Sequence, residues 1–179
     1  SRYKATQWDA VAPSSEYFME LRRVSAHQIV WGANHFIAAM PLSSPCWIVW
    51  DKVNGENNFA DAELAWTSFP SAVRMFSFRW QGMLQGNMAA KEERIHPTQK
   101  PVALYRWLLQ NYAKPGQKIL DTHGGSMSIA IACDIEGFDL DLCELDPDYF
   151  AAGKKRLEQH QAQPRLFDAP TPQPVQLTL

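Results

Sequence analysis

One segment, residues 118–160, limits the fold of this chain more than any other. A strand, a glycine-containing turn, a helix, a second strand and a second helix are predicted in succession over 118–121, 122–126, 129–136, 138–143 and 146–160. Gly137 ends the first of these helices, and Asp146 followed by proline caps the second. Strands that alternate with helices in this way are typical of a parallel sheet, so the sequence predicts an α/β fold.

The turn after the first of these strands has the composition of a cofactor site. Asp121 ends the strand, and Gly124 and Gly125 let the backbone approach a ligand while the next helix points its N–H groups at the same place. Glu144 ends the second strand about twenty residues later, where a carboxylate can accept both hydroxyls of a ribose. A structural turn without a ligand is the alternative, and the two acidic residues favour a nucleoside-type cofactor.

The rest of the chain predicts further strands and helices. Apolar, β-branched and aromatic residues predict strands at 27–31, 46–50, 62–69 and 73–80, the last two in an antiparallel group. Apolar residues at helical spacing predict helices that begin near Ser15 and at Pro101, and a short helix at 34–40. Residues 81–95 are predicted to form a mobile surface loop.

Composition excludes several classes of protein. Seventeen Lys and Arg against nineteen Asp and Glu give a net charge of −2, which excludes binding of nucleic acid by bulk charge alone. No apolar run reaches the roughly 18 residues that span a bilayer. Cys46, Cys133 and Cys143 are too few and too scattered for a disulfide framework or a zinc site, so we expect no metal and buried free thiols. Free thiols suit a reducing cytoplasm.

A more specific pattern precedes the helix that leads to the first strand. The hexapeptide 96–101 is His-Pro-Thr-Gln-Lys-Pro, and a helix, Pro-Gly, a strand ending Leu-Asp and a Gly/Ser turn follow it. This order resembles the amino-group DNA methyltransferases of the β class, which transfer a methyl group from S-adenosylmethionine to N6 of adenine or N4 of cytosine. Segments 16–34 and 46–52 extend the likeness to phage and prophage adenine methyltransferases, and the resemblance covers roughly residues 8–157.

The resemblance implies a Rossmann-like methyltransferase fold, with a mixed sheet and helices on both faces, and S-adenosylmethionine as the cofactor. Glu144 would hold the ribose of that cofactor. The residues implied to form the cofactor turn are Asp121, Thr122, Gly124, Gly125 and Ser126. The residues implied to lie beside the methionine part of the cofactor are His96, Thr98 and Lys100.

The chain departs from the family pattern in two places. Met127 stands where the family's turn has its second glycine, and its effect depends on whether that position needs a left-handed backbone or is already helical. The catalytic tetrapeptide Asp-Pro-Pro-Tyr is absent, so the catalytic residues are unknown and are expected upstream of Trp8. Residues 146–149, Asp-Pro-Asp-Tyr, are no substitute, because they follow the strand that ends at Glu144 and their Asp and Pro fit a helix cap.

The missing tetrapeptide also affects the expected sheet. In the family, the strand that precedes it lies beside the cofactor strand in the middle of the sheet, and its removal would expose an apolar strand edge. We therefore expect the strands at 118–121 and 27–31 to lie in one sheet with one strand position between them. Direct pairing of these two strands would refute this prediction.

The implied organisation is one methyltransferase domain over 1–160 and an extended tail over 161–179. Within the domain, 8–70 would be the remnant of the catalytic half, 70–95 a target-recognition segment and 96–160 the cofactor half. An ordinary hairpin with a solvated loop is the alternative for the recognition segment. Its candidate DNA-binding residues are Arg74, Arg79, Lys91 and Arg94.

Double-stranded DNA is the expected partner, and a homodimer is a further candidate assembly. The tail contributes a third candidate, because Gln163–Phe167 resembles the short peptide by which bacterial replication proteins dock to the sliding clamp. Packing of Leu166 and Phe167 on the domain is the favoured explanation of that peptide.

We interpret the chain as a DNA amino-methyltransferase that acts on adenine N6, in the cytoplasm of a bacterial or phage-infected cell. A methyltransferase-like DNA-binding or interaction module that has lost catalysis is the alternative, and Met127 and the missing tetrapeptide favour it. A Rossmann-like enzyme with a small-molecule substrate is a third hypothesis, against which the hexapeptide argues.

Overall fold

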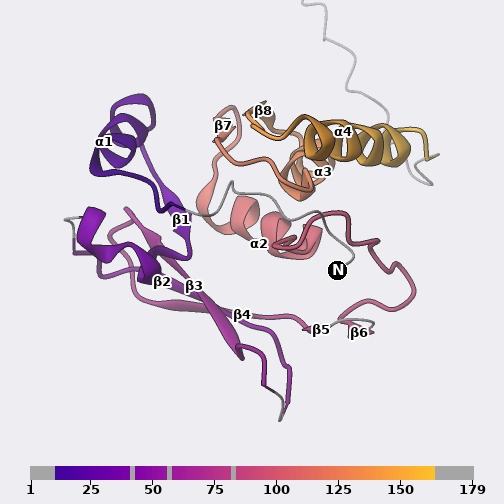
Figure 1. Ribbon diagram of the computed structural model, residues 1–179, viewed down its shortest axis with the longest axis horizontal. Helices are drawn as coiled ribbons and strands as arrows, with labels where there is room; N and C mark the ends of the chain where they lie inside the picture. Colours follow the sequence, from indigo (N-terminus) through magenta and orange to yellow (C-terminus); the bar gives the residue numbers. More distant parts are fainter. Residues whose placement is uncertain (1–10, 41–42, 56–57, 82–83, 164–179) are drawn as a thin grey trace, which may run out of the picture.

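The computed structural model describes residues 11–40, 43–55, 58–81 and 84–163 (Figure 1). Its helices are α1 (Ser15–Val24), η1 (Ala33–His35), η2 (Ile37–Ala39), α2 (Val102–Tyr112), α3 (Ser128–Glu136) and α4 (Pro147–Gln161). Its strands are β1 (Ile29–Trp31), β2 (Trp47–Asp51), β3 (Ala62–Thr67), β4 (Arg74–Ser77), β5 (Trp80–Gln81), β6 (Leu84–Gln85), β7 (Lys118–Asp121) and β8 (Asp139–Leu142). No helix within these ranges combines the length and the apolar character that a bilayer crossing requires. The region around Trp8 and all of the clamp-like peptide after Gln163 lie outside the described residues.

β1 to β4 form one mixed sheet in the order β1-β3-β2-β4. β3 runs antiparallel to β1 and β2, and β4 runs parallel to β2. Successive residues of β3 show its two faces, as expected for an alternating strand. Ala65 packs with Leu108 of α2, whereas Trp66 packs with Phe18 of α1. Helices therefore cover both faces of this sheet.

β7 and β8 form a separate two-stranded parallel sheet. Ile119 and Leu140 pack on a cluster that contains Leu109 of α2 and residues of α3. The opposite face is exposed and carries an ion pair of 2.8 Å between Lys118 and Asp141. The alternation of charged and apolar residues along β8 thus follows from burial of one face only, whereas in β7 the apolar Leu120 lies on the exposed face.

Helix α2 joins the two sheets (Figure 1). Leu109 packs on the β7–β8 side, whereas Leu108 packs with Ile48 and Ala65 of the larger sheet. Tyr105 packs against both clusters. One helix therefore spans from one sheet to the other and sets their relative position.

Two expectations about the strands need correction. The segment 73–80 was expected in an antiparallel group, but β4 runs parallel to β2, because the chain crosses from β3 to the far side of β2. A single sheet was expected to contain β1 and β7, but the two lie in separate hydrogen-bonded sheets. They do not pair with each other, and no strand in the described part of the chain fills a place between them.

The cysteine expectation is wrong at one position. Cys46 and Cys133 are buried free thiols, but Cys143 is exposed. Cys143 still donates its N–H to the carbonyl of Asp121, and because side chains alternate along an extended chain it lies on the same face as the exposed Asp139 and Asp141. The apolar composition around Cys143 therefore does not extend the buried core to this residue.

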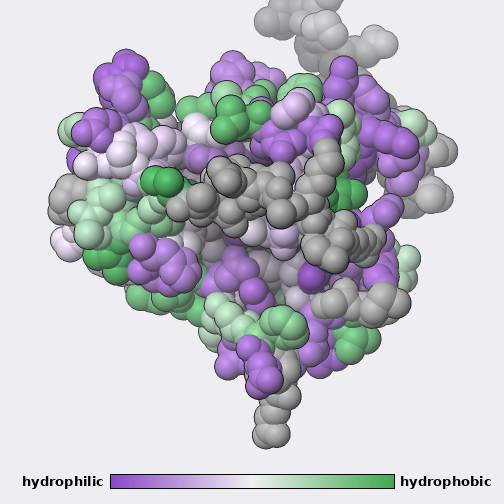
Figure 2. All heavy atoms as spheres, viewed as in Figure 1, coloured by the Kyte–Doolittle hydropathy of each residue, from purple (hydrophilic) through white to green (hydrophobic). Residues whose placement is uncertain are grey.

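Helix α4 begins at the cap that the sequence predicts. The Asp146 side chain accepts the backbone N–H groups of Asp148 at 2.8 Å and of Tyr149 at 3.1 Å, and Pro147 is the first helical residue. Hydrophilic side chains gather over α4 on the face shown in Figure 2, which agrees with its exposed Lys154. The Asp-Pro-Asp-Tyr segment therefore has a structural role.

We predict that Asp146→Ala lowers the free energy of unfolding by about 1 kcal/mol, because two N–H groups lose their acceptor. Asp146→Asn keeps an acceptor oxygen and should leave the stability nearly unchanged. Chemical denaturation of both variants measures the difference. Equal losses in the two variants would contradict the capping role.

Candidate functional site

The turn after β7 is held by hydrogen bonds to the end of β8. Gly124 donates its N–H to the carbonyl of Cys143 at 2.7 Å. Gly125 donates its N–H to the Glu144 carboxylate at 2.6 Å. Gly125 has a φ of +50°, and a Cβ on Gly124 would collide with Leu142. A side chain at either glycine would therefore be strained or would displace Leu142, and the turn and β8 form one unit.

The Glu144 carboxylate also joins this turn to the start of α4. One of its oxygens accepts the Gly125 N–H, and the other accepts the N–H of Asp146 at 2.9 Å. A carboxylate offers about four acceptor positions, so two hydrogen bonds leave capacity for further donors. Glu144 can therefore accept hydroxyl groups of a ligand while it holds the turn.

Asp121 ends β7 on the same side. Its carboxylate accepts the backbone N–H of His123 at 2.9 Å. Burial raises the pKa of Asp121, and the nearby charge of Glu144 acts in the same direction. The two acidic residues that the sequence placed at one sheet edge are thus close enough to influence each other.

Met127 occupies a backbone position that suits glycine. It has φ +56° and ψ +28° and is the N-cap of α3, so the left-handed alternative raised by the sequence is the one observed. Such a conformation costs an L-residue about 1–2 kcal/mol. The Met127 side chain is buried against Gly153 of α4, where an added Cβ would lie 2.7 Å from its Cγ. The turn keeps its shape because Gly153 leaves space for this side chain.

His96 lies against the turn. Its ring is buried, and a Cβ on Gly125 would lie 3.6 Å from its Nδ1. That nitrogen accepts the N–H of Thr98 at 3.3 Å and lies 3.1 Å from the Thr98 hydroxyl. The Tyr149 ring packs edge-on against the His96 ring, with 4.2 Å between the two ring centroids. Burial lowers the pKa of His96, which favours a neutral imidazole at neutral pH.

Lys100 belongs to a charged cluster beside the turn. Its ammonium lies 3.2 Å from one carboxylate oxygen of Glu63, and Lys52 lies 2.6 Å from the other. Burial opposes ionisation of Glu63, but Lys100 and Lys52 outweigh it and hold its pKa below the usual value. Lys100 also stands 5.6 Å from the Trp31 ring and lowers the pKa of Asp121. The carboxyl ends of β1, β2 and β7 therefore face the same side.

Helix α1 reaches the turn from the other half of the molecule. The Tyr17 hydroxyl lies 2.7 Å from the hydroxyl of Thr122, which lies 2.9 Å from Nδ1 of His123. The Tyr17 ring also meets the His123 ring edge-on. Sequence reasoning missed Tyr17, because its partner lies 105 positions away and such a contact has no local signature.

Residues 84–95 are held by side-chain hydrogen bonds, in contrast to the mobile loop predicted. Gln99 accepts the N–H of Ile95 at 2.9 Å and donates to the carbonyl of Glu93 at 3.1 Å. Arg94 donates to the carbonyl of Trp80 at 3.0 Å and lies 4.6 Å over its ring. Arg94 is therefore engaged within the protein. The other predicted DNA contacts are exposed: Arg74, Arg79 and Lys91.

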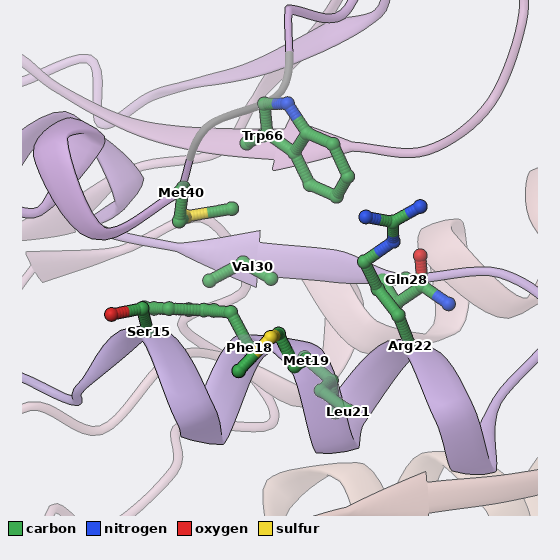
Figure 3. Close-up of a pocket in the computed structure, with 9 residues that line it drawn as sticks. All are labelled: Ser15, Phe18, Met19, Leu21, Arg22, Gln28, Val30, Met40 and Trp66. Carbon is green, nitrogen blue, oxygen red and sulfur yellow. The ribbon is translucent and has the colours of Figure 1, made fainter.

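An apolar cavity of about 100 Å³ lies elsewhere, between α1 and the sheet (Figure 3). Phe18 and Leu21 line it from α1, and Val30 and Trp66 line it from β1 and β3. No predicted cofactor residue lines this cavity. A nucleoside cofactor needs hydrogen-bonding partners, which the turn offers and this cavity largely does not.

Comparison with known proteins identifies the family of the chain. The family model of N6_N4_Mtase, described as DNA methylase, matches residues 49–155, more than half of the chain. The chain belongs to this DNA methylase family. No curated protein matches its sequence.

The fold is also that of solved methyltransferase structures. The M1.HpyAVI–SAM complex is 20% identical, with a TM-score of 0.59 over 81% of this chain and 83% of that one. A second crystal structure, described as M1.HpyAVI alone, is also 20% identical, with a TM-score of 0.54 over 80% of each chain. This DNA methylase therefore has the α/β methyltransferase fold that the sequence predicted.

We predict that Gly153→Ala destabilises the protein by about 1–2 kcal/mol, because its methyl group would overlap Met127 beside the turn. Helix propensity alone predicts the opposite sign, a gain of about 1 kcal/mol. Thermal or chemical unfolding measures the sign. The double variant with Met127→Ala should recover part of the loss, and a stabilised single variant would contradict the packing described here.

We predict that Glu63→Gln lowers the free energy of unfolding at pH 7 by about 2 kcal/mol, because Lys52 and Lys100 lose their shared anion. The pKa of Glu63 is lowered from 4.5, so its contribution is present above that pH and is lost as the pH falls through the lowered value. Denaturation between pH 3 and pH 7 should therefore show a shallower acid loss in the variant. An identical pH dependence in both proteins would contradict the cluster.

Proposed function

We propose that this chain binds S-adenosylmethionine and transfers its methyl group to an exocyclic amino group in DNA, namely adenine N6. The observation that carries the proposal is the turn whose Gly125 N–H is held by Glu144 and against which His96 packs. Membership of the DNA methylase family supports DNA as the substrate. The description of M1.HpyAVI as a SAM complex supports the cofactor.

The residues around the turn fit such a cofactor. Glu144 retains acceptor capacity for ribose hydroxyls, and the Gly124–Gly125 backbone has no Cβ to obstruct a close approach. The predicted cofactor residues Asp121, Thr122 and Ser126 lie on the same turn, with His96, Thr98 and Lys100 on its hexapeptide side. S-adenosylmethionine supplies an electrophilic methyl group on its sulfonium. The protein contributes mainly orientation, because an amino group needs no strong base to attack that methyl group.

We place the catalytic tetrapeptide on a strand between β1 and β7. Both strands have a free edge among the described residues, and their carboxyl ends face the same side. Helix α2 packs on both sheets and would cover such a strand. Residues on such a strand would hold the target amino group beside the cofactor turn.

The recognition of DNA is assigned to residues 70–95. Exposed Arg74, Arg79 and Lys91 suit contacts with phosphates, and a basic segment can act locally although the chain has a net charge of −2. A catalytically inactive DNA-binding module is the second candidate function. Met127 and the missing tetrapeptide support it, and the retained shape of the turn argues against it.

Calorimetric titration with S-adenosylmethionine tests the cofactor proposal. We expect micromolar binding that Glu144→Ala weakens at least about tenfold, because an acceptor at the ribose is lost. Asp141→Asn, at an exposed acid of β8 three residues before Glu144, should bind as the unmodified protein does. Absence of binding to a folded chain would overturn the proposal.

Transfer of labelled methyl groups to duplex DNA tests the reaction. Label on adenine would support the adenine proposal. Cofactor binding and DNA binding without any transfer would favour the inactive module.

A further inference from the structure

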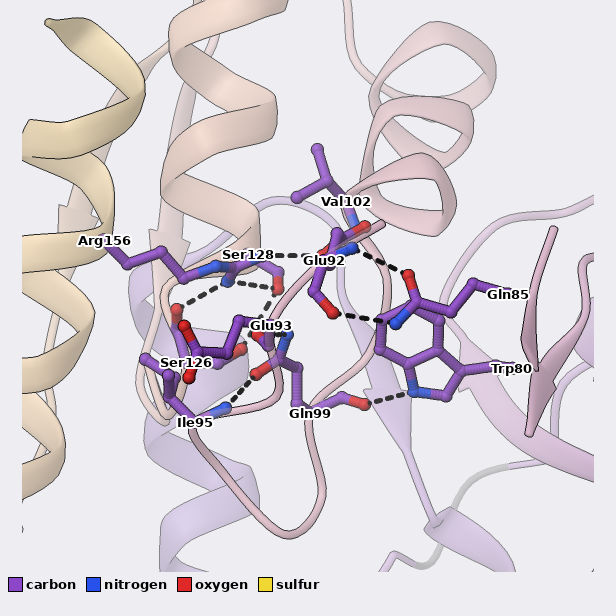
Figure 4. Close-up of polar contacts among 10 residues, drawn as sticks. All are labelled: Trp80, Gln85, Glu92, Glu93, Ile95, Gln99, Val102, Ser126, Ser128 and Arg156. Carbon is purple, nitrogen blue, oxygen red and sulfur yellow. Dashed lines mark hydrogen bonds and ion pairs between the residues drawn. The ribbon is translucent and has the colours of Figure 1, made fainter. Parts of the chain in front are cut away.

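Glu92 connects two elements that lie far apart in the sequence (Figure 4). One oxygen of its carboxylate accepts the N–H of Val102, in the first turn of α2, at 2.9 Å. The other lies 2.6 Å from Nη2 of Arg156 in α4. The side chains of Glu92 and Arg156 are 18% and 13% exposed, so this ion pair is largely shielded from water.

Arg156 in turn binds residues of the cofactor turn. Its Nη1 donates to the carbonyl of Ser126 and to the hydroxyl of Ser128, each at 2.8 Å. The two serine hydroxyls lie 3.0 Å apart. Ser126 is a predicted cofactor residue, and Met127 between the two serines has the left-handed backbone. One guanidinium therefore contacts both sides of the strained position.

The segment around Glu92 is itself fixed. Gln85 donates to the backbone carbonyl of Glu92 and accepts its N–H, both at 2.8 Å. Trp80 donates its indole N–H to the carbonyl of Gln99 at 2.9 Å. Figure 4 shows Gln85 and Val102 bonded to Glu92, and Trp80 bonded to Gln99. The segment proposed to meet DNA and the turn proposed to bind the cofactor thus share one hydrogen-bond network.

The ion pair between Glu92 and Arg156 is not explained by a gain in folding stability alone. Burial raises the pKa of Glu92 even though Arg156 opposes the shift. Buried charges lose hydration that their attraction only partly restores, and their best-attested use is to fix one arrangement among several. The ion pair between Arg106 and Glu136 already joins α2 to α3 at a more exposed position. A second, buried ion pair is therefore not needed for joining α2 to its neighbours alone.

We infer that Glu92 and Arg156 are positioning residues, which hold the Ser126–Ser128 part of the cofactor turn in its binding conformation. The inference rests on the proposed function for the cofactor, and it extends that function to residues that do not contact the ligand. Through Gln85 and Glu92, the pair also makes the shape of the turn depend on the order of the recognition segment.

The test compares Glu92→Gln with Glu136→Gln. The first variant keeps an oxygen for the Val102 N–H and removes the charge that Arg156 needs. The second breaks the ion pair with Arg106, also 2.6 Å long, which joins α2 to the far end of α3. Arg156→Lys is a milder second variant if Glu92→Gln fails to fold, because lysine keeps the charge and loses the planar set of donors. Three quantities are measured: the melting temperature, amide hydrogen exchange at 124–128, and the affinity for S-adenosylmethionine.

We expect Glu92→Gln to speed amide exchange at 124–128 and to weaken cofactor binding, each by about tenfold, the scale of a lost charge-assisted hydrogen bond. Glu136→Gln should change neither, whatever its melting temperature. Wild-type exchange and affinity in Glu92→Gln would overturn the inference, and so would equal effects in both variants. If the unmodified chain does not bind the cofactor, the proposed function fails, and the exchange measurement alone still decides the positioning role.

Discussion

The hydrogen bonds of the Glu144 carboxylate are the constraint on which the site depends. Glu144 follows β8, accepts the Gly125 N–H and accepts the Asp146 N–H, so it fixes the turn, the strand edge and the start of α4 relative to one another. The glycines allow the close approach, and the helix caps follow from the resulting geometry. A ligand at this edge would therefore meet a turn that is already formed, which lowers the entropy lost on binding.

Met127 shows how a departure from a motif can be absorbed. A methionine with positive φ is strained, and its side chain must leave the ligand side of the turn. Gly153 provides the space on α4, and Arg156 on the same helix binds the backbone and side chain on either side of Met127. The helix after β8 thus compensates for the missing glycine, although it lies about twenty-five residues further along the chain and has no place in the turn motif.

Local patterns predicted the elements of the cofactor half well. The caps at Asp146 and Gly137, the end of β7 at Asp121 and the fold class all depend on neighbouring residues, whereas β8 ends at Leu142, before the end that the sequence predicted. Contacts between distant segments were missed, including Tyr17 with Thr122 and Glu92 with Arg156, because two charged or polar residues far apart in sequence carry no periodic signal. The prediction of a mobile surface loop at 81–95 was wrong for the same reason. The polar residues there suit a solvated loop, but Gln85, Glu92 and Gln99 bind backbone groups.

The central claim is that the preformed turn after β7 binds the cofactor. Titration of isotope-labelled protein with S-adenosylmethionine, followed by NMR of the backbone amides, examines this residue by residue. We predict that the chemical-shift changes concentrate at Gly124, Gly125 and Ser126, with smaller changes at His96. Shifts confined to the apolar cavity around Phe18 and Trp66, or no shifts in a folded chain, would contradict it.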